Sequence, residues 1–112
     1  MDGGTEGLRA GVFDVFGTPL AFASTSYLTQ FPAPSWAEQD PNDWWDALGK
    51  SVRKAISDSG ISVDQIAAMT VDTTCCSVVP LDDSGNPVRP ALIWMDVRSA
   101  EQAEQMVATE DD

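Results

Sequence analysis

The side chains best suited to chemistry lie within the first nine residues. The run Asp2-Gly3-Gly4-Thr5 brings together a carboxylate, two glycines and a hydroxyl, and Arg9 follows soon after. Glycines let a backbone approach phosphate oxygens, to which N–H groups and a Thr hydroxyl can donate. A carboxylate can hold hydrated Mg²⁺, and an Arg can stabilise charge on a phosphoryl group in transfer. Taken alone, so short a motif more often marks a plain hairpin turn with a surface Arg.

A second candidate cluster is the adjacent pair Cys75 and Cys76. A disulfide between neighbouring residues is strained, and a zinc site needs more ligands than this pair supplies. The chain contains no His, which excludes His-based triads and the commonest metal ligand. The alternative for the pair is a strand end built from small residues, because free Cys often packs as a small hydrophobe. An acidic chain also disfavours a reactive thiolate.

The charge balance limits the classes of partner. Lys and Arg number 6 against 18 Asp and Glu, a net charge of -12. Nucleic acid is excluded as a partner, because binding it requires cations that displace phosphate counterions. An anionic membrane surface would repel the chain for the same reason, and no apolar run reaches membrane-spanning length. The polar N-terminus lacks the pattern of a signal peptide, so the expected location is cytoplasmic.

A hairpin must position the N-terminal motif. The pattern of apolar residues predicts one strand over 8–15 and a second over 20–28, joined by a tight turn at 16–19. The Asp2–Thr5 run itself is predicted to be a turn, preceded only by Met1 where an opening strand would be expected.

A helix is predicted over 41–58. Asp40 suits the N-cap, Pro41 suits the first helical position, and Gly60 is a candidate C-cap glycine. Apolar residues recur between these ends at helical spacing. Of the two tryptophans in its first turn, one is expected to pack into the core and the other lies about 100° away around the helix.

The remaining chain is predicted to form short elements joined by turns. These are a connector at 63–67, buried strands at 68–71 and 77–81, a turn at 82–86, a strand at 88–94 and a helix at 98–108. Pro90 cannot donate to a sheet ladder, which favours an edge position or a strand start. The order of elements predicts one small α/β domain within 112 residues.

Four segments together resemble the FGGY carbohydrate kinases. Residues 2–9 resemble the first phosphate motif of that family, D-x-G-T-x-x-x-R. Residues 36–45 are similar to its W-x-E-Q-D-P-x-x-W-W segment, and residues 91–98 to its P-A-I-L-W-x-D-x-R segment. Residues 71–76 fall where the family places a strand end that bears sugar contacts. The segments occur in the family's order, and the resemblance covers essentially the whole chain.

The resemblance implies a fold and an activity. The fold is a partial actin-like, ribonuclease-H-like α/β domain, a mixed sheet with flanking helices whose first strand is truncated. Such kinases close two domains around a cleft and transfer the γ-phosphoryl group of ATP to a sugar hydroxyl. Residues 1–112 are then an incomplete N-terminal domain. The C-terminal domain and the general-base Asp are absent, and the isolated fragment is expected to be inactive.

The resemblance also implies residue roles around ATP and Mg²⁺. Asp2 would support Mg²⁺ and the reacting centre, while Thr5 and Arg9 would lie near the transferring phosphoryl group. Gly3 and Gly4 would bind the nucleotide together with Thr5.

On the sugar side, the resemblance places Cys75 and Cys76 at the substrate. Xylulokinase-like members carry Met-His there, so this pair departs from their pattern and leans toward a ribulokinase-like branch. The implied substrate is a pentulose such as ribulose or xylulose. Asp96 and Arg98 would flank the same pocket, although a local ion pair near a helix start is the stronger alternative for them.

Three hypotheses follow for the chain. It is part of an ATP-dependent pentulose kinase, or a binding module that has lost catalysis, or an inactive fragment that exposes apolar surface. Trp36 fits two roles equally, since it can pack at the entry of the helix or line the sugar cleft. The sequence leaves room for a homodimer and does not identify the sugar.

Overall fold

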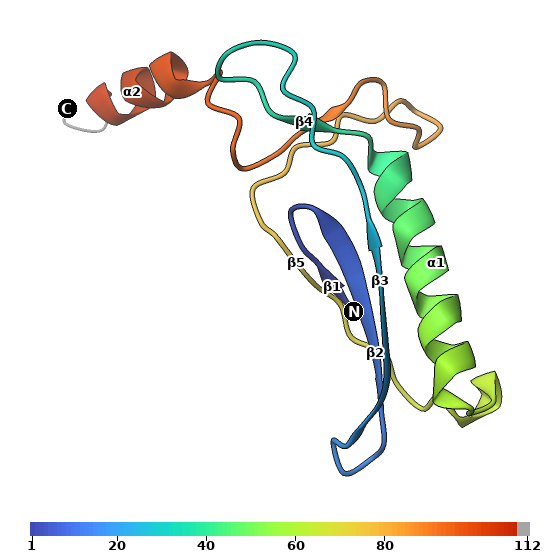
Figure 1. The fold of residues 1–112 in the computed structure, drawn as a ribbon. Coiled ribbons are helices and arrows are strands. Elements are labelled where there is room, and N and C mark those ends of the chain that lie inside the picture. The colour runs from blue at the N-terminus through green and yellow to red at the C-terminus, as the bar shows by residue number, and fades with distance from the viewer. Residues whose placement is uncertain (110–112) are drawn as a thin grey trace.

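The computed structural model describes residues 1–109. A four-stranded sheet with the order β3-β2-β1-β5 forms its body, and helix α1 runs along one face of it (Figure 1). The strands are β1 (Asp2–Gly3), β2 (Gly7–Phe13), β3 (Pro19–Ser26) and β5 (Asp72–Thr73). β1 pairs antiparallel with β2 and parallel with β5, so the sheet is mixed. The predicted α/β class is confirmed.

Strands β2 and β3 form the predicted hairpin. The carboxylate of Asp14 accepts hydrogen bonds from the backbone N–H groups of Phe16 and Thr18, both at 2.9 Å. Gly17 has a φ of 84°, a conformation that glycine adopts without a steric penalty. The side chain of Asp14 and the backbone conformation of Gly17 therefore close this turn.

Helix α1 (Pro41–Ser59) begins and ends at the predicted caps. Asp40 accepts a hydrogen bond from the N–H of Asn42, and Gly60 ends the helix with a φ of 71°. Ala47, Ser51 and Ala55 recur every fourth residue, and each is 1% exposed. This stripe of small residues is the face that meets the sheet.

The core between α1 and the hairpin consists of small residues. Ala10 of β2, Ala23 of β3 and Ala55 of α1 form one buried cluster. The hydroxyl of Ser51 donates across the interface to the backbone oxygen of Leu8 at 3.2 Å and also contacts the hydroxyl of Thr25 at 2.9 Å. Small side chains on both surfaces allow the helix to lie close to the sheet.

A second, two-stranded sheet lies beyond the N-terminus of α1 (Figure 1). β4 (Glu38–Gln39) pairs antiparallel with β6 (Ala91–Leu92). The strand predicted at 88–94 contains only β6, and residues 77–81 contribute only isolated bridges at Val78 and Leu81. β4 was not predicted, because two residues are too few for a periodic pattern to appear.

The strand predicted at 68–71 is wrong. These residues are exposed and lie outside any strand, and pairing begins only at β5. The N-terminal amine of Met1 donates to the backbone oxygen of Thr70 at 2.9 Å, which aligns this segment beside β1. The apolar run in this segment therefore has the sequence pattern of a buried strand, but no other element of residues 1–109 covers it.

The remaining helices are short. The connector contains a 3-10 helix, η1 (Val63–Gln65), and α2 (Ala100–Ala108) begins two residues later than predicted. α2 extends away from both sheets and buries none of its residues (Figure 1). Among the described residues, no helix is both long and apolar enough to cross a membrane.

Candidate active site

A row of polar residues crosses the sheet on the face opposite α1. Asp2 lies opposite Arg9 on β2 and opposite Asp72 on β5, and Arg9 in turn lies opposite Ser24 on β3. Residues opposite one another in a sheet project to the same face. The neighbours of Arg9 along β2 are buried on the α1 side, so Arg9 and its partners project to the other side.

Asp2 and Arg9 form an ion pair, with Nη2 of Arg9 2.5 Å from Oδ2 of Asp2. Both side chains remain about half exposed or more, at 47% for Asp2 and 66% for Arg9. The pair leaves the other carboxylate oxygen and the rest of the guanidinium open to a ligand. The structure thus brings together the two charged residues that the sequence singled out.

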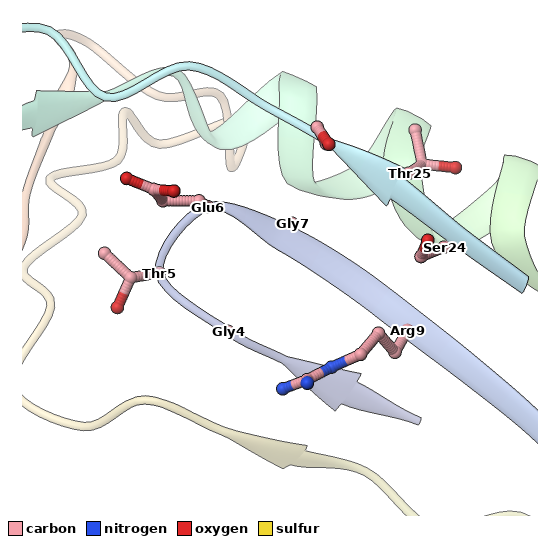
Figure 2. Close-up of a pocket in the computed structure, with 8 residues that line it drawn as sticks. Gly4, Thr5, Glu6, Gly7, Arg9, Ser24 and Thr25 are labelled. Atoms are coloured by element: carbon pink, nitrogen blue, oxygen red, sulfur yellow. The ribbon is translucent and has the colours of Figure 1, made fainter.

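The turn between β1 and β2 borders a shallow hollow of about 300 Å³. The N–H of Gly4 donates to the backbone oxygen of Gly7 at 3.0 Å and closes the turn. Figure 2 shows Arg9 reaching from β2 over β1 beside this turn. The hollow is lined by Gly4, Thr5, Glu6, Gly7, Arg9, Ser24, Thr25 and Ser26. Gly3 lies in β1 and does not line it.

Thr5 is fixed by two side chains that the sequence did not single out. Nε2 of Gln39 donates to the backbone oxygen of Thr5 at 2.6 Å, and Nε1 of Trp94 donates to its hydroxyl oxygen at 3.1 Å. Because that hydroxyl accepts from Trp94, its own hydrogen is available to an incoming oxygen. The signal was present in the sequence, since Gln39 and Trp94 stand inside two of the segments that carried the resemblance.

Cys75 and Cys76 lie at the same edge of the sheet as the turn. The N–H of Thr74 donates to the backbone oxygen of Gly3 at 3.1 Å, which continues the parallel pairing up to the cysteines. Both thiols are exposed, and their sulfurs lie 3.5 Å apart. The hydrogen bond and the charge of Cys75 raise the pKa of the Cys76 thiol above its ordinary value of 9.0. Cys76 is therefore protonated at neutral pH and is a poor nucleophile there.

Asp96 and Arg98 contact each other, and neither lines the hollow. Nε of Arg98 lies 2.8 Å from Oδ2 of Asp96, and Nη2 lies 2.8 Å from Oε1 of Glu38. The guanidinium also stacks 3.9 Å from the ring centre of Trp36. The hydrogen bond from Arg98 holds the pKa of the Asp96 carboxyl well below its usual range, and burial opposes this shift. Asp96 also accepts from the N–H of Ala37 at 2.9 Å.

Trp36 belongs to this cluster, where its ring packs against Arg98 beside the β4–β6 sheet. In the first turn of α1, the indole N–H of Trp44 donates to Gln39, whereas Trp45 is 74% exposed.

The comparison with known proteins decides the family. Residues 1–111 match the N-terminal domain of the FGGY family of carbohydrate kinases. The chain belongs to this family.

Individual relatives of this FGGY chain include two kinds of kinase. It is 38% identical over 107 residues to a xylulose kinase of Streptomyces coelicolor, covering 96% of this chain and 21% of that protein. It is 33% identical over 106 residues to a glycerol kinase of Thermococcus onnurineus, covering 95% of this chain and 22% of that protein. The chain thus spans about a fifth of the length of the curated relatives it matches.

The structural comparison agrees. The crystal structure of xylulose kinase from Rhodospirillum rubrum superposes with a TM-score of 0.90 at 30% identity, covering 96% of this chain and 22% of that one. A second crystal structure, that of a xyloylose kinase from Brucella ovis, gives a TM-score of 0.92 at 25% identity, covering 98% of this chain and 23% of that one. These are sugar kinases of the actin-like fold, and the predicted partial actin-like domain is confirmed.

The residues of this FGGY chain fit the ATP and Mg²⁺ that the family resemblance implied. Mg²⁺ is usually held by one or two protein carboxylates together with phosphate oxygens and water. Asp2 supplies such a carboxylate on the exposed face, with Asp72 opposite it on β5. Arg9, the Thr5 hydroxyl and the glycine turn beside them suit phosphate oxygens. Within residues 1–109, no cluster of three or more candidate ligands forms an all-protein metal cage.

Proposed function

We propose that this chain is the N-terminal part of a kinase that transfers the γ-phosphoryl group of ATP to a hydroxyl of a pentulose. One observation carries the proposal. Asp2 and Arg9 form an ion pair on adjacent strands beside the glycine turn that holds Thr5. A carboxylate, a guanidinium and a hydroxyl on one exposed face are the groups that phosphoryl transfer uses for positioning and charge stabilisation.

Each group would have a distinct task. Arg9 would neutralise charge that develops on the phosphoryl oxygens, and the free hydrogen of the Thr5 hydroxyl would donate to one of them. Asp2 would hold Mg²⁺, which when bound supplies further charge neutralisation on the phosphates. Gly4, which lines the hollow, would keep a side chain out of the space that the nucleotide needs, and Gly3 would lead into it from β1. The ion pair would keep Arg9 and Asp2 oriented before substrate binds.

The sugar is proposed from the neighbouring sheet edge. Cys75 and Cys76 follow β5 at the edge where β1 leads into the turn, so they would line the substrate beside the phosphoryl group. A pentulose is favoured by the 38% identity to a xylulose kinase. Glycerol is the second candidate, because a glycerol kinase relative is 33% identical over nearly the same residues. The named relatives give no support for ribulose over xylulose.

The domain assignment is part of the proposal. Residues 1–112 would be an incomplete N-terminal domain, with the general base and the second half of the cleft supplied by further chain. It is supported by the share of the relatives that the chain covers, 21% and 22% of their lengths. Without those parts the chain alone would not turn over, because phosphoryl transfer depends on a complete, preorganised site.

The test is an acceptor-dependent ADP-release assay. The complete open reading frame that contains this chain would be expressed and supplied with Mg-ATP and D-xylulose, D-ribulose or glycerol, with a no-acceptor control. We expect ADP release with a pentulose to exceed the control by at least about tenfold, as for an ordinary kinase turning over its substrate. ADP release with glycerol but with neither pentulose would mean that the acceptor is glycerol and not a pentulose. Release with none of the three, together with acceptor binding that needs no ATP, would favour a binding module instead.

A further inference from the structure

We propose that Cys75 and Cys76 form a reversible redox site, in which a hydroperoxide joins the two sulfurs into a disulfide and weakens binding of the sugar. The two thiols are adjacent in sequence, both are exposed, and their sulfurs lie 3.5 Å apart. Cysteines close to each other and open to solvent are the usual targets of reversible oxidation. The effect on the sugar rests on the proposed function, whereas the oxidation itself rests on the two thiols alone.

The hydrogen bond within the pair gives the two sulfurs different roles. The thiol of Cys76 donates to the sulfur of Cys75. This bond and the charge of Cys75 raise the pKa of Cys76, so Cys76 is the sulfur that keeps its proton. Since a thiolate and not a thiol attacks a peroxide, the first oxidation falls on Cys75. Cys76 is then the resolving thiol beside it.

The reaction takes two steps and consumes one hydroperoxide. In the first step, the Cys75 thiolate attacks a peroxide oxygen, an S–O bond forms and the O–O bond breaks. The leaving oxygen takes up the proton that the thiol had released to solvent, and Cys75 becomes a sulfenic acid. In the second step, the Cys76 sulfur attacks the Cys75 sulfur, and the S–S bond forms as the S–O bond breaks. The released hydroxide takes the Cys76 proton and leaves as water, so the pair has lost two electrons to the peroxide.

The geometry of the pair makes this disulfide easy to reduce again. Cα atoms of adjacent residues lie about 3.8 Å apart, which is shorter than the separation of about 4.4 to 6.8 Å that a disulfide prefers. Cys76 already has a φ of 64°, in the left-handed region that L-residues rarely adopt. Disulfides that are strained and exposed are the labile ones that a dithiol reductant opens.

Closure of the disulfide would alter the sheet edge that faces the sugar. It would remove the S–H donor of each cysteine and draw the two side chains toward each other. The phosphate-binding turn is coupled to this change less directly, through the N–H of Thr74, which donates to the backbone oxygen of Gly3 at 3.1 Å. Binding of the sugar should therefore weaken more than binding of Mg-ATP.

The experiment treats the complete kinase with hydrogen peroxide and then with dithiothreitol. Mass spectrometry follows the peptide that contains Cys75 and Cys76, and initial rates are measured with the accepted pentulose. The oxidised peptide should lose the mass of two hydrogens and resist alkylation. The KM for the pentulose should rise at least about fivefold while that for Mg-ATP stays within about twofold, because the lost contacts are those of the sugar. Dithiothreitol should reverse every change.

One variant identifies the sulfur that is oxidised first. Cys76→Ser keeps Cys75 but cannot close the disulfide, so Cys75 should stop at the sulfenic acid, which dimedone traps. This variant is compared with its own untreated form, since Cys76 lies at the proposed sugar site. Ser84→Ala in the exposed turn at 82–86 is the control, and it should oxidise and recover as the wild type does.

The outcomes separate the two proposals. Two free thiols after peroxide, oxidation to a sulfinic or sulfonic acid, or a bond from either sulfur to a different cysteine would overturn the redox site. A disulfide that forms between the pair and leaves the pentulose KM unchanged would overturn its effect on the sugar. An enzyme that is inactive with every acceptor would contradict the proposed function, and the mass measurement would still decide whether the disulfide forms.

Discussion

Gly7 shows how tightly single residues are constrained around the turn. A Cβ placed on Gly7 would lie 2.9 Å from the backbone oxygen of Thr25 and 3.2 Å from the Cα of Ser26, both on β3. Backbone atoms cannot move aside as a flexible side chain can. At Gly3, by contrast, the nearest atom to an added Cβ would be Cβ of Thr73 at 3.5 Å, an ordinary contact. Neither glycine needs a positive φ.

We therefore predict that one of two glycine substitutions destabilises the fold and that the other does not. Gly7→Ala should lower the free energy of unfolding by about 1–3 kcal/mol, the usual cost of overpacking. Gly3→Ala should change it by less than about 0.5 kcal/mol, as for a substitution without steric conflict. Urea denaturation of the two variants and the wild type measures both. Equal stabilities for the two variants would contradict the register that places Gly7 against β3.

The cysteine pair gives a second prediction at the residue scale. The hydrogen bond and charge of Cys75 raise the pKa of the Cys76 thiol, so at pH 8 a smaller fraction of Cys76 is the reactive thiolate than for an ordinary Cys. Cys75→Ala removes both the hydrogen-bond acceptor and the neighbouring charge and should lower that pKa, which increases the rate at which iodoacetamide alkylates Cys76. Peptide mass spectrometry across pH 7–10 follows the rate. An unchanged or slower rate at pH 8 in Cys75→Ala would contradict this effect of Cys75 on Cys76.

Among the elements, α1 depends on the small size of the residues it buries. Ala55 is 1% exposed and packs against Ala10 and Ala23, which leaves no space for a longer side chain. Ala55→Leu should destabilise the fold by about 1–3 kcal/mol. Ala103→Leu on the exposed helix α2 is the control and should change stability by less than about 0.5 kcal/mol. Thermal denaturation distinguishes them, and a stable Ala55→Leu protein would mean that α1 does not lie close to the sheet.

The elements with local signals were predictable from the sequence. Helix α1 carries its own start and stop, an Asp cap and a C-cap glycine, and the β2–β3 hairpin carries alternation and a turn. The strand predicted at 68–71 failed because an apolar run indicates burial only if another element covers it. β4 and β6 were missed or misjudged because a two-residue strand is defined by its partner and not by its own pattern.

The candidate site was predictable only in part, for the same reason. Asp2, Thr5 and Arg9 lie close together in sequence, so their motif indicated a shared site, and the ion pair of Asp2 and Arg9 is observed. The contact of Trp94 with Thr5 spans 89 residues and is created by folding. Sequence reasoning recognised the segment containing Trp94 without indicating what that side chain contacts.

At the scale of the molecule, residues 1–109 expose much large apolar surface while the buried hydrophobic residues are mostly Ala. The described chain is elongated, with extents of 57 × 31 × 29 Å. Exposed large side chains include Phe16 at 91%, Leu28 at 76% and Met69 at 75%. Surfaces of this kind commonly contact other protein. This supports the proposal that the chain forms part of a larger kinase.

The most direct test of the account is the effect of Arg9→Ala on kcat/KM for Mg-ATP in the complete kinase. Arg9 should act on the transferring phosphoryl group, so we predict a loss of about 100-fold or more. The melting temperature should change little, because an exposed ion pair contributes about 0–1 kcal/mol. Arg53→Ala on the exposed side of α1 is the control and should keep the wild-type value. An Arg9→Ala enzyme as active as that control would contradict the assignment of the β1–β2 turn to phosphoryl transfer.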